Sequence, residues 1–159
     1  MRASKLVQLM KLNSATMTGA LVQRIRTSRK CDELPRRVGD REQKQYAVEI
    51  FRDLIDFLGN EEDANLERRY VDLGFHRAGQ GVPLFQMFWA VCIAREYLWE
   101  YVQQECLQED PVEFWGGVTL LRSLNVFFDR VLYFALVGYQ RAEKDEAAAM
   151  TFLVGRRSA

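Results

Sequence analysis

The sequence predicts an all-α fold, a single-domain bundle of about five or six helices whose last helix is unusually long. Apolar residues recur at helical spacing through most of the chain, no segment alternates as a strand would, and cap and breaker residues separate the periodic segments. The chain has 159 residues, of which 48% are hydrophobic. It is therefore long and apolar enough to bury one core without disulfides or metals.

The charge balance excludes partners that require a strongly charged protein. The 22 basic residues offset 22 acidic ones, so the net charge attracts neither nucleic acid nor an anionic membrane. Basic residues gather between Arg24 and Arg41, but acidic residues interleave them, which favours a solvated helix end over an anion-binding patch. No apolar run reaches the roughly 18 residues of a membrane span, and the first residues do not resemble a signal peptide.

The cysteines are typical of a reducing compartment. Cys31, Cys92 and Cys106 are odd in number and lack the short spacings of zinc and redox motifs. We therefore expect a cytoplasmic protein.

The first forty residues predict a helical entry followed by a loop. Leu6 and Met10 begin an apolar face, which continues from Met17 after a possible cap at Asn13 or Ser14. This pattern predicts two short helices or one interrupted helix. Breakers in segments 32–35 and 38–40 then predict a loop.

Two further helices are predicted between residues 40 and 79. Asp40 with Gln43 resembles a capping box, and an apolar stripe follows up to Gly59, which we expect to end the helix in the left-handed conformation. Asn60 is a candidate cap for the next helix, whose first turn would carry the acids at 61–63. That helix should stop at Gly79.

The last two helices are long and apolar. Gly81, with Pro83 at the first helical position, predicts a helix over 84–107 that is apolar on more than one side and therefore central. Asp110 and Pro111 begin the final helix, which can continue to Met150. At 1.5 Å per residue that helix would be about 60 Å long, so we expect its end to project. Segment 116–117, two glycines, offers a place for a bend.

The single histidine, His76, has two interpretations. It lies near the C-terminal end of a predicted helix, where the helix dipole stabilises a cation, and we favour this structural role. The alternative is an axial haem ligand in a haem-binding or other small-molecule-binding globin-like carrier or sensor. A structural role is favoured because no second histidine supports a distal pocket.

The sequence predicts no enzyme and no catalytic, cofactor or metal site. Glu96 and Glu100 share a helix face, but the di-metal Glu-x-x-His pattern is absent. The turn from Gly79 to Gly81 has neither a preceding strand nor a phosphate-loop motif, so it predicts a tight corner between helices. No serine lies in a nucleophile elbow.

Aromatic residues of the last helix are candidates for a dimer interface as well as for core. A long apolar helix that outruns its own domain is a common dimer surface. We take Phe127, Val131, Phe134 and Tyr139 as the candidate dimer and relay residues.

The predicted corner resembles a known family. Its residues are Arg77-Ala78-Gly79-Gln80-Gly81-Val82-Pro83-Leu84. This segment is similar to the corner that joins two helices in the N-terminal sensory domain of the RsbR and RsbRD co-antagonist proteins of bacterial stressosomes. The helix after the corner is also similar, and the likeness extends loosely over residues 5–145.

The resemblance implies a globin-like helical fold that binds no haem, a homodimer, and coupling through the final helix to an output domain or partner protein. The residues that carry it are Arg77, Gly79, Gln80, Gly81 and Pro83. We therefore expect a sensory and dimerisation domain over residues 1–150, a C-terminal tail over 151–159, and a role in signal transduction. The resemblance names no small-molecule ligand.

Overall fold

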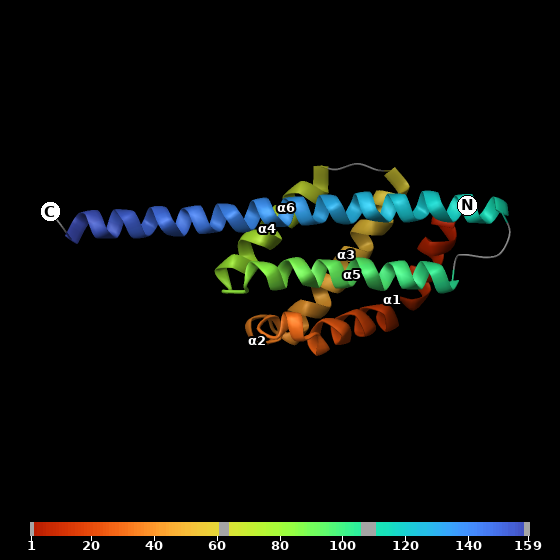
Figure 1. Cartoon of the computed structure of the whole chain (residues 1–159), viewed down its shortest axis with the longest axis horizontal. Coiled ribbons are helices and arrows are strands. Elements are labelled where there is room, and N and C mark those ends of the chain that lie inside the picture. Colours follow the sequence, from red (N-terminus) through yellow and green to blue (C-terminus); the bar gives the residue numbers. More distant parts are fainter. Residues whose placement is uncertain (1, 61–63, 106–110, 158–159) are drawn as a thin grey trace.

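The computed structural model describes residues 2–60, 64–105 and 111–157, and within these residues the chain forms helices and no strands. Figure 1 shows α5 (Leu84–Glu105) lying antiparallel beside the first half of α6 (Pro111–Arg157). Three more long helices pack around this pair: α1 (Arg2–Thr27), α3 (Asp40–Asn60) and α4 (Ala64–Gly79). The prediction of an all-α domain with a long last helix is confirmed. None of the described helices could span a membrane.

The N-terminal segment is one interrupted helix, as predicted. The backbone of Asn13 leaves the helical region, with φ −109° and ψ 15°, and the Asn13 amide donates to the Tyr101 hydroxyl at 3.2 Å. After α1 comes the short 3₁₀ helix η1 (Arg29–Cys31), and the predicted loop contains one more short helix, α2 (Leu34–Arg37). Pro35 fits there because a first-turn residue needs no N–H donor.

The side chain of Gln86 anchors that short helix to α5. Its Oε1 accepts hydrogen bonds from the backbone amides of Glu33 at 2.9 Å and Leu34 at 3.0 Å, and its Nε2 donates to Asp32 at 2.7 Å. A buried side chain from a distant helix thus satisfies the first amides of α2.

Helix α3 begins at Asp40, as predicted, but its predicted capping and its predicted end are wrong. The helix begins at Asp40 with Gly39 as the capping position, because the Gln43 amide bonds to the Gly39 carbonyl, and the Gln43 side chain bonds to Val38 instead of closing a capping box. At the other end, Gly59 remains helical and α3 ends at Asn60. Glycine tolerates both conformations, so its position alone does not define the last residue. The predicted acidic first turn at 61–63 lies outside the described residues.

The core lies where α1, α3, α4 and α5 meet the first half of α6. The central position predicted for α5 is confirmed, since it contacts α1, η1, α4 and α6. Helix α6 runs unbroken through its glycine pair, and its first residue is Pro111, as predicted. The predicted cap at Asp110 and the stretch after Glu105 lie outside the described residues. The largest fully buried side chains are Phe127, Phe128, Leu6, Met10, Met17, Leu21, Leu54, Leu98 and Leu124.

Candidate functional site at the interhelical corner

The turn between α4 and α5 is closed by a pair of backbone hydrogen bonds. The Val82 amide donates to the Arg77 carbonyl at 3.1 Å, and the Gly81 amide donates to the Ala78 carbonyl at 3.0 Å. Gly81 has φ +73°, the left-handed conformation that glycine adopts without penalty. This is the Schellman arrangement that ends many helices. Pro83 lies one residue before α5 rather than at its first position, and its carbonyl accepts the first amides of that helix.

A carboxylate from α3 gathers the polar side chains of the corner. Glu42 Oε1 accepts from Arg77 at 2.8 Å, Glu42 Oε2 accepts from Gln80 Nε2 at 3.0 Å, and His76 Nε2 lies 3.0 Å from Glu42 Oε1. Arg77 also donates to Gln80 Oε1 at 2.7 Å. Three residues of the corner region therefore converge on one acid in the first turn of another helix.

Electrostatics favour the charged form of Glu42. Partial burial raises the pKa of this carboxyl, but hydrogen bonds from Arg77 and Gln80 and the charge of Arg77 outweigh burial and hold the pKa below its usual value. Arg77 is itself buried, and its guanidinium lies 4.3 Å from the centre of the Tyr46 ring, where a cation–π contact stabilises it. The corner thus contains a buried cation with three stabilising partners, Glu42, Gln80 and the Tyr46 ring.

The corner is joined to α6 by a buried hydrogen bond. The Tyr139 hydroxyl donates to the Val82 carbonyl at 2.7 Å. Burial raises the pKa of Tyr139, so the phenol keeps the proton that it donates.

Helices α4 and α6 cross backbone against backbone. A Cβ atom on Gly74 would overlap the Ala135 carbonyl, and a Cβ atom on Gly138 would overlap the Val71 carbonyl. The crossing therefore depends on glycine at both positions. With the Tyr139 hydrogen bond, it links the position of α4 and its corner directly to that of α6.

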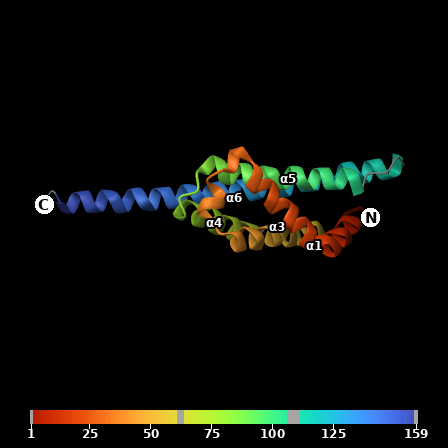
Figure 2. The same ribbon diagram turned by 90° about the horizontal axis from the view of Figure 1, so that it is seen from below.

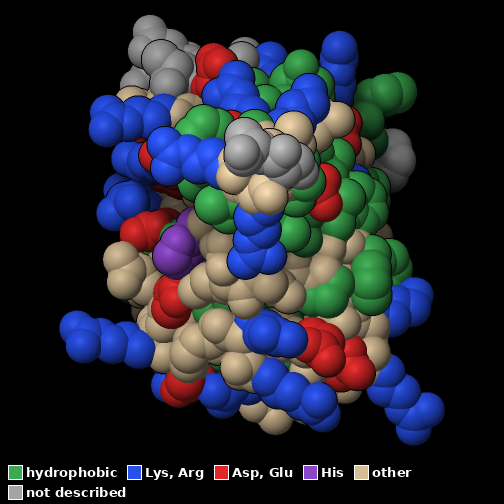
Figure 3. Space-filling model, turned by 90° about the vertical axis from the view of Figure 1, so that its left-hand side faces the viewer, with side chains coloured by type: hydrophobic (Ala, Val, Ile, Leu, Met, Phe, Trp, Pro, Cys, Tyr) green, Lys and Arg blue, Asp and Glu red, His purple; other side chains and the backbone are tan. Residues whose placement is uncertain are grey.

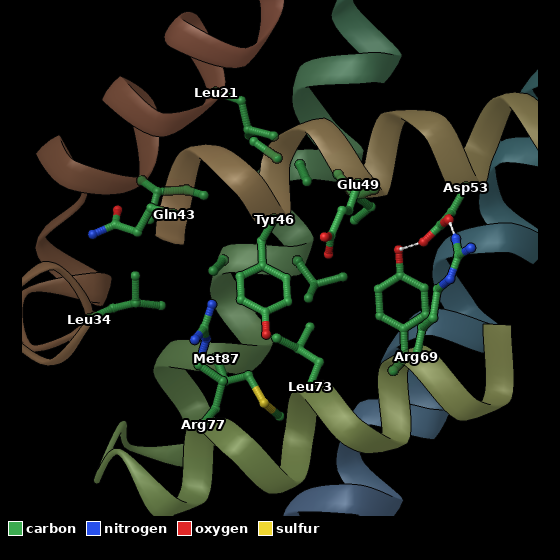
Figure 4. A pocket seen from close by; sticks show the side chains of 17 residues that line it. Leu21, Leu34, Gln43, Tyr46, Glu49, Asp53, Arg69, Leu73, Arg77 and Met87 are labelled. Atoms are coloured by element: carbon green, nitrogen blue, oxygen red, sulfur yellow. Dashed lines mark hydrogen bonds and ion pairs between the residues drawn. The ribbon is translucent and has the colours of Figure 1, made fainter. Parts of the chain in front are cut away.

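A cavity of about 100 Å³ lies between α1, α3, α4 and α5 beside the corner. Figure 4 shows its labelled lining side chains, with Tyr46 near the middle of the view and Arg77 below it. Most of the exposed lining is apolar. The complete lining is Leu21, Ile25, Leu34, Gln43, Tyr46, Ala47, Glu49, Ile50, Asp53, Arg69, Tyr70, Leu73, Arg77, Met87, Ala90, Val91 and Ala94.

A buried polar cluster closes one end of this cavity. Asp53 pairs with Arg69 and accepts a hydrogen bond from the Tyr70 hydroxyl at 2.9 Å, as the dashed lines in Figure 4 show. Burial raises the pKa of Tyr70 well above its usual value, so its hydroxyl remains a donor. The carboxylate is therefore compensated on both sides.

The structure assigns different roles to the predicted corner residues. Arg77 and Gln80 meet at Glu42, and Gly81 supplies the left-handed turn. Gly79 is the last residue of α4, as predicted, and a Cβ atom there would meet nothing within 4 Å. Of these residues, Gly79 is therefore the one that a larger residue could replace without a steric clash.

The predicted dimer and relay residues lie mostly inside the protomer. Phe127, Val131 and Tyr139 are buried, whereas Phe134 is partly buried and packs against the core. A neighbouring residue, Tyr133, is 64% exposed. Of these neighbouring aromatic side chains, Tyr133 is therefore the exposed one and Phe134 the one that packs against the core.

His76 lies on the surface, where Figure 3 shows it beside acidic side chains. Its side chain is 54% exposed, its Nε2 contacts Glu42, and it does not line the cavity beside the corner. This geometry favours the structural role over a haem ligand. Among the described residues, no group of three or more His, Cys, Asp or Glu side chains could hold a metal ion.

Sequence reasoning missed two acids that organise the site. The only sequence signal for Glu42 was its position in the first turn of a helix, and this position did not indicate which side chains it would contact. Asp53 offered a clearer indication, because it lies three residues after Ile50 on the same buried stripe. A carboxylate at a core position requires buried partners.

Comparisons with known proteins agree with the resemblance of the corner. The family model for the RsbT co-antagonist protein rsbRD N-terminal domain matches residues 15–151. No curated protein and no solved structure matches the chain.

Proposed function

Because the chain belongs to the family of RsbT co-antagonist rsbRD N-terminal domains, we propose that it is a dimeric, cytoplasmic signal-input domain that relays a conformational change through α6. Family membership supports a regulatory role in the stressosome rather than a catalytic one. The recipient is an output domain or a partner protein. We further propose a globin-like arrangement without haem, with residues 1–150 forming the sensory and dimerisation domain and residues 151–159 the tail.

The observation that carries this proposal is the length of α6. The helix has 47 residues, and after Tyr139 none of its described side chains is buried. Figure 2 shows this second half projecting alone from the body of the protein. The projecting segment consists largely of residues with high helix propensity, so it behaves as a rigid rod. Such a rod can transmit a rotation or a shift over its length.

The start of the rod is held by the contacts that define the corner. Tyr139 joins it to Val82, and the glycine crossing joins it to the backbone of α4. A ligand or partner that moves α4 or the corner must therefore move α6 or break these contacts. Packed elements of this kind shift between discrete arrangements rather than deforming gradually.

One exposed face of α6 carries apolar side chains, before and within its projecting half, that a second copy could bury. Tyr133 and Met150 are 64% and 62% exposed. Alternating spacings of three and four residues place them on one stripe with Leu136, Gln140, Glu143 and Ala147. This is the spacing of a parallel coiled-coil seam, and we propose that a second α6 packs along it.

The seam supplies a matched pair of variants for a test. We expect sedimentation equilibrium to show a dimer for the wild-type protein, and Met150→Glu to shift it towards monomer because each seam position would bury two carboxylates. Phe152→Glu is the control, since Phe152 is equally exposed but lies off the seam, and it should leave the dimer intact. A strict monomer at high protein concentration, or equal effects of the two variants, contradicts the proposed interface.

The relay is tested separately in the native context. Truncation after Gln140 removes the projecting half but leaves every buried residue of α6 in place. We expect the truncated chain to retain its helical fold and to lose signalling output. Output that survives the truncation contradicts a relay through α6.

A further inference from the structure

We propose that the cavity between α1, α3, α4 and α5 is a binding site for a small, largely apolar molecule that carries no negative charge. Phenol represents this class. The site rests on the proposed function only for its role as the input of the signal, because each protomer can bind the molecule by itself. Two observations carry the proposal: the volume and apolar lining of the cavity, and the pairing of the cations around it.

The volume of the cavity limits the ligand to the size of one aromatic ring. About 100 Å³ is several times what one water molecule requires, and it approaches the size of cavities that bind benzene. Three of the lining residues are alanines, Ala47 of α3 and Ala90 and Ala94 of α5, and larger side chains at these positions would take up part of the space. The predominantly apolar lining favours a ligand over ordered water.

The charges around the cavity exclude an anionic ligand. The lining contains two cations, Arg69 and Arg77. Both cations already pair with carboxylates, Arg69 with Asp53 and Arg77 with Glu42. An anion entering this space would lose its hydration without gaining an unpaired cation.

The structure also shows an approach to the cavity and a route from it to the corner. Tyr46, Glu49, Arg69 and Leu73 line both the cavity and a shallow surface depression, so they form the wall between the two. Arg77 lines the cavity and also holds the corner acid Glu42. A ligand against Tyr46 and Arg77 therefore touches the residues that position the corner. An occupied cavity biases α6 if the ligand prefers one arrangement of these residues.

Thermal unfolding with added small molecules tests the site in the intact chain. We expect millimolar phenol and toluene to raise the melting temperature, and benzoate to have no effect. Ala90→Leu fills the cavity and should abolish the phenol shift, and a native circular dichroism spectrum would show that this variant folds. Ala148→Leu adds the same side chain on the exposed part of α6 and should retain the shift.

The contrary outcomes are equally definite. The site is wrong if phenol produces no shift in the wild-type protein, if it stabilises Ala90→Leu as strongly as Ala148→Leu, or if benzoate binds as well as phenol. Phenol binding by a monomeric protein would retain the site and overturn the dimeric relay, so the two proposals fail separately.

Discussion

Replacing Gly138 with alanine should destabilise the protein, although the same substitution usually stabilises a helix. A Cβ atom at this position would overlap the carbonyl of Val71 on the neighbouring helix. The obstacle is backbone, which cannot rotate away as a side chain can. The helices must therefore separate or slide, and the packing between α4 and α6 loosens.

The expected magnitude follows from two opposing contributions. Overpacking a tight site costs about 1–3 kcal/mol, and a backbone obstacle places this case near the upper end. Alanine regains about 1 kcal/mol of helix propensity over glycine. The net loss in the free energy of unfolding is therefore about 2 kcal/mol, which corresponds to a fall in melting temperature of roughly 4–8 °C for a chain of this size.

Gly19→Ala is the matched control, because Gly19 also lies inside a helix and a Cβ atom there would meet nothing within 4 Å. It should leave stability unchanged or raise it by up to about 1 kcal/mol. Urea unfolding followed by circular dichroism, at one fixed protein concentration, measures both variants. A Gly138→Ala protein as stable as Gly19→Ala would refute the close crossing and the coupling of α4 to α6 that rests on it.

Two further predictions concern the corner. Tyr139→Phe removes the donor to the buried Val82 carbonyl and should lower the free energy of unfolding, measured in urea, by about 1–3 kcal/mol. Tyr133→Phe, at an exposed position, is the control and should change it by less than about 0.5 kcal/mol. Equal effects of the two substitutions would contradict a stabilising role of the Tyr139 hydrogen bond. Glu42→Gln should destabilise the protein at neutral pH, because Arg77 loses its carboxylate. Since the folded state lowers the pKa of Glu42, its contribution is complete above the ordinary value of about 4.3 and is lost as the pH falls through the lower folded value. The stability difference between the two proteins should therefore shrink in unfolding experiments at pH 3, and a constant difference would assign the effect to something other than this charge.

The elements of the fold could be predicted because their determinants are local. The interruption of α1 near Asn13, the end of α4 at Gly79 and the start of α6 at Pro111 all follow from cap and breaker residues within a few positions. The unusual length of α6 follows from uninterrupted helix formers after Tyr139. The end of α3 has a weaker determinant and was missed, because Gly59 remains helical and the helix continues to Asn60.

The contacts of the site could not be predicted in the same way. Glu42 is 35 residues away from Arg77, and Gln86 is 53 residues away from Glu33, whose amide it binds. No local pattern pairs such residues, because the pairing depends on how α3, α4 and α5 are oriented. The burial of the candidate dimer residues could not be predicted for a similar reason, since a shift of one residue on a helix moves a side chain by about 100°.

The sequence alone therefore determined the all-α class, the approximate limits of the helices and the corner that carries the family likeness, since each depends on residues close together in the chain. Tertiary structure decided which side chains meet at that corner. It brought Glu42 to Arg77, Val82 to Tyr139 and Gly74 to the backbone of α6, and it left a cavity between α1, α3, α4 and α5. These features arise from packing between distant segments, and the periodicity of each helix is compatible with many such packings.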